Sequence, residues 1–198
     1  MKKILSLICM AIAVVVSVEF VSAQSKAIQK EAKKAAKSLK KQGWYADSNH
    51  TLEYCLARFT ELEEENETFV GRASGFGNEK VAKNAARRDA IRESIEAATS
   101  AFRGIGDELE GKLNGQAIDN LTMASVSKYE GKIESEMKVS FVLFKRNPDN
   151  TFDAQAYVYV PQNTASEARK EAMIDALKET AIAETYINEI EKIVNEKF

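Results

Sequence analysis

The side chains best suited to covalent chemistry lie at positions 50 and 55. His50 is the only histidine of the chain, and Cys55 follows it by five residues. A thiol beside an imidazole is the pair that nucleophilic catalysis uses, but residues at this spacing do not share a face of a helix. Cys55 instead fits an apolar helical position, which predicts a buried small hydrophobe. We expect His50 in a solvated loop and no catalytic residue; a nucleophilic Cys55 is the alternative.

Neither a metal nor a cofactor is expected. Asp47 and Glu53 are the only carboxylates close to His50 and Cys55 in the sequence, and a zinc site needs more ligands than these residues supply. The glycines at 71, 75 and 77 precede a predicted helix, whose N-terminus is suited to an anion. However, no Lys-Ser/Thr pair and no correctly spaced third glycine follow, so neither nucleotide-binding motif is complete.

Asp89 lies among arginines at positions 87, 88 and 92. One interpretation is an anion-binding face on a helix. The other is structural, either a salt-bridged surface or a carboxylate that fixes the helix to a sheet. Exposed ion pairs are frequent and contribute only about 0–1 kcal/mol, which favours the structural interpretation.

The first 23 residues have the pattern of a secretory signal peptide. Lys2 and Lys3 precede an apolar run over 4–18, and Val21-Ser22-Ala23 supplies a small-x-small cleavage site. The run is shorter than the roughly 20 residues of a membrane-spanning helix, and Cys9 lies too early in it for lipidation. We therefore predict an exported chain that starts at Gln24 and is periplasmic or secreted, with peripheral outer-membrane attachment as an alternative.

Charge is unevenly distributed along the exported chain. The whole sequence has 28 basic and 30 acidic side chains, a mildly acidic balance that argues against nucleic acid as a partner. Seven lysines nevertheless lie between residues 24 and 43, against the single Glu31. This lysine-rich segment, 26–41, is either a solvated helical face or a contact to an anionic surface.

The hydrophobic patterns predict eight elements. Helices are expected over 25–42, 51–65, 79–103 and 164–197, with a helical hairpin or a broken helix over 107–130. Strands are expected over 67–76, 133–145 and 152–160. We expect Gly43 just past the first helix, Thr51 or Asn49 as the cap of the second, and a capping box at Thr164 and Glu167.

These elements predict an α+β fold, with a three-stranded, mainly antiparallel sheet packed by a long central helix and a C-terminal helix. The expected organisation is a signal peptide at 1–23, an N-terminal helical arm at 24–66 and an α+β domain at 67–198. Gly71 is followed by an alanine-rich helix, so we expect close packing of that helix on the strand.

The predicted hairpin has a second face. If the odd positions of 133–145 and the even positions of 152–160 face the core, four large side chains lie opposite. These are Val142, Phe144, Tyr157 and Tyr159. Such a face is either a contact surface for a partner or is covered by the helix at 51–65, and the apolar stripe of that helix favours coverage.

The segment from Gly71-Arg72-Ala73-Ser74-Gly75 to Ala85-Ala86-Arg87-Arg88-Asp89-Ala90 resembles small bacterial envelope lipoproteins that are related to the N-terminal domain of a flagellar assembly protein. The lysine-rich segment followed by Gly43-Trp44 is separately similar to the start of exported proteins of Bacteroidota. The resemblance covers about 67–185 and implies a strand, a helix, a later hairpin and a terminal helix. It implies no catalytic residues, and the chain lacks the acylated cysteine of the lipoprotein members.

Export, a well-patterned core and no convergent set of titratable groups lead to one expectation. The chain is predicted to be a non-enzymatic binding or structural module of the cell envelope, or a secreted one, whose partner is another envelope protein or surface. A small-ligand-binding protein is the alternative, and an enzyme that uses Cys55 is less favoured.

Overall fold

The computed structural model describes residues 26–180 and 184–198. The predicted leader and the expected start at Gln24 lie outside these residues. The elements in chain order are a helix described over 26–41, called here the N-terminal helix, and then β1 (Trp44–Ala46), α2 (Leu52–Leu62), β2 (Asn66–Phe76), α3 (Glu79–Glu108), α4 (Gly115–Glu136), β3 (Lys138–Arg146), β4 (Phe152–Pro161), α5 (Gln162–Glu179) and α6 (Glu184–Lys197).

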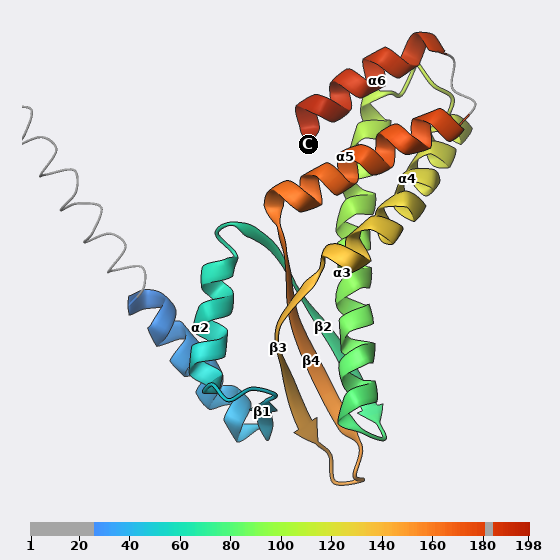
Figure 1. Ribbon diagram of the computed structural model, residues 1–198. Coiled ribbons are helices and arrows are strands. Elements are labelled where there is room, and N and C mark those ends of the chain that lie inside the picture. Colours follow the sequence, from blue (N-terminus) through green and yellow to red (C-terminus); the bar gives the residue numbers. More distant parts are fainter. Residues whose placement is uncertain (1–25, 181–183) are drawn as a thin grey trace, which may run out of the picture.

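The fold is α+β, with an antiparallel sheet of four strands in the order β1-β3-β4-β2 (Figure 1). The sequence predicts three strands, and β1 is the additional one. Gly43 has φ +86° and ends the N-terminal helix as expected, because glycine adopts this conformation without strain. The reversed chain then pairs Trp44 with Lys145 and Ala46 with Leu143. Three residues are too few to show an alternating pattern.

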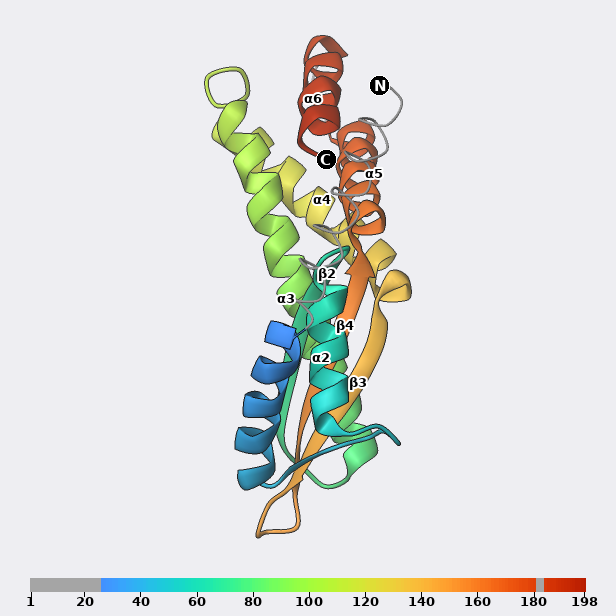
Figure 2. The ribbon, with the colours of Figure 1, turned by 90° about the vertical axis from the view of Figure 1, so that its left-hand side faces the viewer.

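Helices cover both faces of the sheet. The main core lies between one face and the helices α3 to α6, with Val158 and Val160 of β4 fully buried in it. A second apolar cluster lies on the other face, beneath the N-terminal helix and α2 (Figure 2). The segment expected as a separate arm therefore supplies both a strand and a covering layer to the same sheet.

The close packing of α3 on β2 follows from Gly71. A Cβ atom at this position would lie 2.0 Å from the carbonyl oxygen of Ala86 and 2.8 Å from the Cβ of Ala90. The buried stripe of α3 runs through Ala82, Ala86 and Ala90, all with 0% exposure. The expected contact between glycine and alanine is confirmed, whereas Val81, predicted on the stripe, is 46% exposed.

Several helix boundaries differ from the prediction. Helix α3 continues past Gly104 to Glu108, because a helix interior tolerates glycine at a modest cost. The helical hairpin expected within 107–130 is not formed, because α3 ends at Glu108 and the single helix α4 begins at Gly115 and continues through the rest of this range. Helix α4 extends to Glu136, so Ile133, predicted in a strand, belongs to a helix. The C-terminal helix is two helices, because Thr180 has an extended backbone with ψ 142°.

The start of α5 also differs from the prediction. The helix begins at Gln162, directly after Pro161, and no side chain caps it. Asn163 accepts a hydrogen bond from the backbone N–H of Thr164 at 2.8 Å, so the capping box predicted at Thr164 and Glu167 is wrong. In contrast, Thr51 caps α2 as expected, accepting from the N–H of Tyr54 at 3.2 Å.

The outer half of α3 runs beyond the end of the sheet, where α4, α5 and α6 gather around it (Figure 1). The molecule therefore has a sheet-containing end and an all-helical end. Over the described ranges, none of the helices combines the length and the apolar character needed to cross a bilayer.

Candidate binding surfaces

The N-terminal helix has two chemically opposite sides. At 100° per residue, its seven lysines fall within an arc of about 120°. We call this arc the lysine face; its members are Lys26, Lys30, Lys33, Lys34, Lys37, Lys40 and Lys41, all of which are exposed. The opposite side buries Ala32 and Ala36, which are 6% and 0% exposed, with Leu39 packed against the second apolar cluster. Docking of that side turns the lysines outward.

The lysine face is largely uncompensated. Lys40 lies 3.9 Å from a carboxylate oxygen of Glu53, and both side chains are about half exposed. The other six lysines have no ion-pair partner within the described part of the chain. Neighbours three and four residues apart repel one another on a helix, as Lys30 and Lys34 do. An anionic partner would relieve this repulsion.

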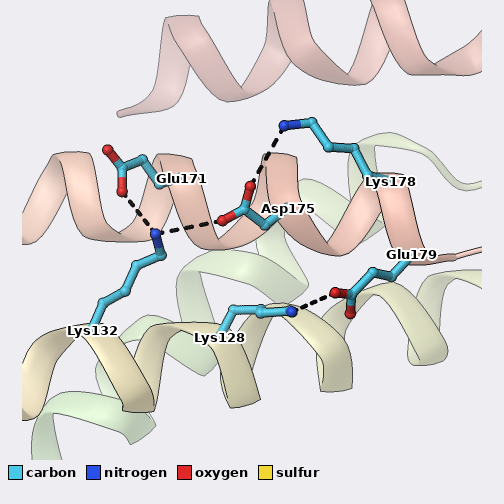
Figure 3. Close-up of polar contacts among 6 residues, drawn as sticks. All are labelled: Lys128, Lys132, Glu171, Asp175, Lys178 and Glu179. Carbon is cyan, nitrogen blue, oxygen red and sulfur yellow. Dashed lines mark hydrogen bonds and ion pairs between the residues drawn. The ribbon is translucent and has the colours of Figure 1, made fainter.

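Lysines at the contact between α4 and α5 are paired instead (Figure 3). Lys128 bonds Glu179 at 2.5 Å, and Lys132 bonds Glu171 at 2.8 Å and reaches Asp175 at 3.4 Å. The hydrogen bond with Glu171 raises the pKa of Lys132. This surface ties two helices together and leaves little charge for a ligand.

An open groove of about 600 Å³ separates the N-terminal helix from α2. Lys33 lines it from the N-terminal helix, and Tyr54, Arg58 and Glu61 line it from α2. Arg58 and Glu61 are paired at 2.8 Å. Tyr54, which is 54% exposed, therefore places an aromatic side chain at the border of the lysine face.

The predicted contact surface is not assembled as expected. Val142 and Phe144 are each 2% exposed and belong to the main core, whereas Tyr157 belongs to the second cluster. The cause is an irregularity in β3, because Val139 pairs with Val158 but Phe141 pairs with Tyr157. One extra residue moves all later side chains to the other face. The shared face of the four residues is therefore a wrong prediction.

Helix α2 covers Tyr157, as the favoured interpretation of this face predicts. The ring of Tyr157 stacks on Phe141 at 4.2 Å and meets the edge of Phe59 at 5.1 Å. Burial raises the pKa of Tyr157. Tyr159 is only half-buried, so it is the one member of the predicted set with substantial access to solvent.

Cys55 and His50 have separate environments. Cys55 is 6% exposed on the buried side of α2, and its thiol donates to the hydroxyl of Ser48 at 3.8 Å. His50 is exposed, with its ring 4.7 Å from that of Tyr54. Burial of Cys55 follows the prediction. In residues 26–180 and 184–198, no cluster of three or more potential metal-ligating side chains is found.

Asp89 fixes α3 to the sheet. Its Oδ2 accepts the backbone N–H of Arg72 in β2 at 2.8 Å, and its Oδ1 accepts from Arg92 at 2.5 Å. Strand β2 lies at the edge of the sheet, so the carboxylate also satisfies an edge donor that would otherwise be open to another strand. The structural interpretation of Asp89 is thus supported.

The sequence patterns do not predict a largely buried polar network that joins α5 to β2. Arg169 of α5 pairs through both terminal nitrogens with the carboxylate of Glu67 at the start of β2, and its guanidinium lies 5.6 Å from the ring centre of Phe198. Beside it, the hydroxyls of Ser94 and Tyr129 are 3.0 Å apart. The paired residues Glu67 and Arg169 are 102 positions apart, so no local pattern could have joined them.

Comparison of the chain with protein-family models, with curated proteins and with solved structures finds no match. The resemblance to the envelope lipoproteins therefore stays a prediction that rests on the strand and helix at 71–90.

Proposed function

We propose that this chain is an exported, non-enzymatic module of the cell envelope that binds an anionic surface through its lysine face. The observation that carries the proposal is the two-sided N-terminal helix. Its apolar side is docked in the second cluster, with Ala36 fully buried. The docking holds seven lysines in a fixed row instead of leaving them on a flexible tail.

The geometry suits a flat partner. The row from Lys26 to Lys41 is about 22 Å long at 1.5 Å per residue. This length suits a contact with an extended surface. The apolar side is engaged inside the protein and does not insert into lipid, so attraction must be electrostatic. Each lysine near an anionic lipid surface contributes about 1 kcal/mol to the free energy of binding. The contributions of several lysines together give the chain affinity for that surface.

Export supports the same proposal. The predicted leader at 1–23 directs the chain to the envelope, where phospholipid headgroups and other anionic polymers are available. The partner is then a surface, and the helical end of the molecule remains free to support another envelope component.

The test is sedimentation of the exported protein with vesicles. We expect binding to phosphatidylglycerol vesicles, little binding to neutral phosphatidylcholine vesicles, and loss of binding in 1 M salt, where the Debye length falls to about 3 Å. The triple variant K30Q/K34Q/K37Q should lose about 3 kcal/mol, or roughly 100-fold in affinity.

A charge-matched control makes the test specific. K80Q/K138Q/K170Q removes the same charge from lysines that lack an ion-pair partner in the described ranges and lie outside the N-terminal helix. It should bind like the unmodified protein. Equal losses in the two triple variants would show a net-charge effect and would refute the lysine face as the binding surface.

A further inference from the structure

The groove between the N-terminal helix and α2 has a chemically mixed lining, unlike the rest of the lysine face. Gln29 and Lys33 line it from the N-terminal helix, and α2 contributes Glu53, Tyr54 and Glu61 among others. A cation, carboxylates, an amide and an aromatic ring therefore surround one volume of about 600 Å³. Attraction to a charged surface requires the cations alone, so the other groups call for a more specific partner.

The groove follows the axes of the two helices. Residues four apart share one side of a helix, as do Gln29 and Lys33 on the N-terminal helix and Glu53 and Glu61, eight apart, on α2. A hollow of about 360 Å³ adjoins the groove, because it shares Lys33 and Glu53 with it and is lined further by the last three lysines of the N-terminal helix. The combined shape is elongated and suits a linear chain.

Cations outnumber carboxylates in the groove and the adjoining hollow. The lining contains five cationic side chains and two carboxylates, those of Glu53 and Glu61. Each carboxylate already has a cationic neighbour, at 3.9 Å for Glu53 and 2.8 Å for Glu61. Lys33, Lys37 and Lys41 have no ion-pair partner in the part of the chain that the structure describes. The lining therefore favours a ligand that carries negative charge.

The carboxylates and the amide distinguish among anionic ligands. A carboxylate repels a group that is purely negative, but it accepts hydrogen bonds from hydroxyl groups. An ionised carboxylate has about four acceptor positions, so the cation beside Glu53 or Glu61 does not use all of them. The amide of Gln29 can donate as well as accept. These groups suit a ligand that combines negative charge with many hydroxyls.

Tyr54 adds a surface for an apolar ring face. Its side chain is 54% exposed, and its ring lies 4.7 Å from that of His50, which is tilted by 34° to it. A tyrosine ring offers a rigid contact area at a low cost in conformational entropy. The C–H groups of a sugar ring form an apolar face that packs on such a ring, while the hydroxyls at its edge reach polar neighbours.

We infer that the groove binds a linear anionic polysaccharide. Sugar rings pack on Tyr54, hydroxyl groups bond Gln29 and Glu61, and the negative substituents lie against Lys33 and Lys37. The inference rests on the proposed function, because the lysines of the groove belong to the lysine face, and it names the anionic partner as a carbohydrate. An acidic peptide has the charge but lacks the hydroxyls and the apolar ring faces.

The experiment is calorimetric titration of the exported protein with three matched chains. Hexagalacturonate has a carboxylate on each sugar ring, hexaglutamate has the carboxylates without the sugar, and maltohexaose has the sugar without charge. We expect saturable binding of hexagalacturonate, binding of hexaglutamate that is weaker by at least about tenfold, and no detectable binding of maltohexaose. Equal affinity for hexagalacturonate and hexaglutamate would overturn the inference.

Tyr54→Ser tests the aromatic surface. It should weaken hexagalacturonate binding by about tenfold, because the apolar contact with the sugar ring is lost, and should leave hexaglutamate binding unchanged. Met123→Ser is the control, since it removes an apolar side chain that is 72% exposed on α4. It should bind like the unmodified protein. Unchanged hexagalacturonate binding in Tyr54→Ser would refute the site, as would equal weakening by Met123→Ser.

Vesicle binding separates this inference from the proposed function. Lys30 and Lys34 belong to the lysine face but line neither the groove nor the adjoining hollow. K30Q/K34Q should therefore weaken binding to phosphatidylglycerol vesicles more than binding to hexagalacturonate, and Tyr54→Ser should do the reverse. Vesicle binding without a preference for hexagalacturonate would refute the polysaccharide site alone. Hexagalacturonate binding that depends on Tyr54, without vesicle binding, would support the groove and contradict a lipid surface as the partner.

Discussion

At the scale of single residues, one glycine determines how closely a helix approaches the sheet. Gly71 has no Cβ, and this absence lets the backbone of α3 rest on β2. The sequence alone indicates this contact, because a glycine inside a strand usually marks the close approach of another element, and the next element is rich in alanine. The buried position of Cys55 and the cap at Thr51 were also predictable, since both depend on neighbours within one or two helical turns.

Gly71→Ala should therefore destabilise the fold. The new methyl group would meet the carbonyl oxygen of Ala86, a backbone atom that cannot move aside, so we expect a loss at or above the roughly 1–3 kcal/mol typical of overpacking. Urea unfolding followed by circular dichroism measures it.

Gly104→Ala is the matched control in α3. Nothing lies within 4 Å of a Cβ at this position, so replacing glycine inside a helix should add about 0.5–1 kcal/mol of stability. If both substitutions were neutral, the close contact between β2 and α3 would be wrong.

Tyr45 gives a prediction about pH. Burial, together with the hydrogen bond that its hydroxyl donates to Glu79 at 2.7 Å, raises the pKa of Tyr45 to about 12. The protonated phenol is thus favoured by folding. Its contribution to stability is complete below pH 10, the unfolded value, and is lost as the pH rises through about 12.

The absorbance of tyrosinate during an alkaline titration measures this pKa, with Tyr45→Phe used to assign the signal. Glu79→Gln should lower the pKa of Tyr45 towards 10, because it removes the negative charge near the phenolate. A late-titrating signal that remains in Tyr45→Phe would contradict the assignment.

At the scale of elements, the alternation of apolar and polar residues correctly predicted which side chains of β4 face the main core. It assigned most side chains of β3 to the wrong face. From Phe141 to Arg146, β3 pairs with β4 in a regular register. The even positions of β4 face the main core as expected. In β3, the irregularity between Val139 and Phe141 shifts the pattern by one residue. All residues near Ser140 are compatible with a regular strand, so the sequence contains no local signal for the shift. The loss of the predicted contact surface follows from this single residue.

The connections between elements differ in strength. The pair of Arg169 and Glu67 joins α5 to β2 and is largely buried, with side chains 12% and 27% exposed. The pairs between α4 and α5 are more exposed, with 34% for Lys132 and 62% for Glu171. Breaking one partner of a buried pair costs about 3–5 kcal/mol, whereas an exposed pair is worth about 0–1 kcal/mol.

Arg169→Gln should therefore lower the free energy of unfolding by about 3 kcal/mol, at the lower end of the range for buried pairs. Lys132→Gln should cost less than about 1 kcal/mol, and this cost should shrink in high salt. Denaturant unfolding at low and high salt compares the two variants. Similar losses in both would mean that the buried pair contributes no more than the surface pairs.

At the scale of the whole molecule, the sheet is covered on both faces, and the two layers have different roles. The layer of α3 to α6 forms the main core and the helical end (Figure 1). The N-terminal helix and α2 lie on the other face of the sheet (Figure 2), and the lysines of the N-terminal helix are exposed. The α+β class was predictable from the patterns. The joining of residues 26–66 to the sheet was not, because it depends on three residues of β1 and on contacts distant in sequence.

The most direct measurement of the central proposal is photo-crosslinking in the native envelope. A photoreactive amino acid is placed at Lys34, midway along the length of the N-terminal helix, or at Lys170 of α5 as the control. The account predicts strong crosslinks to anionic lipid or polymer from position 34 and few from position 170. Equal crosslinking at both positions, or none at position 34 in the exported protein, would contradict it.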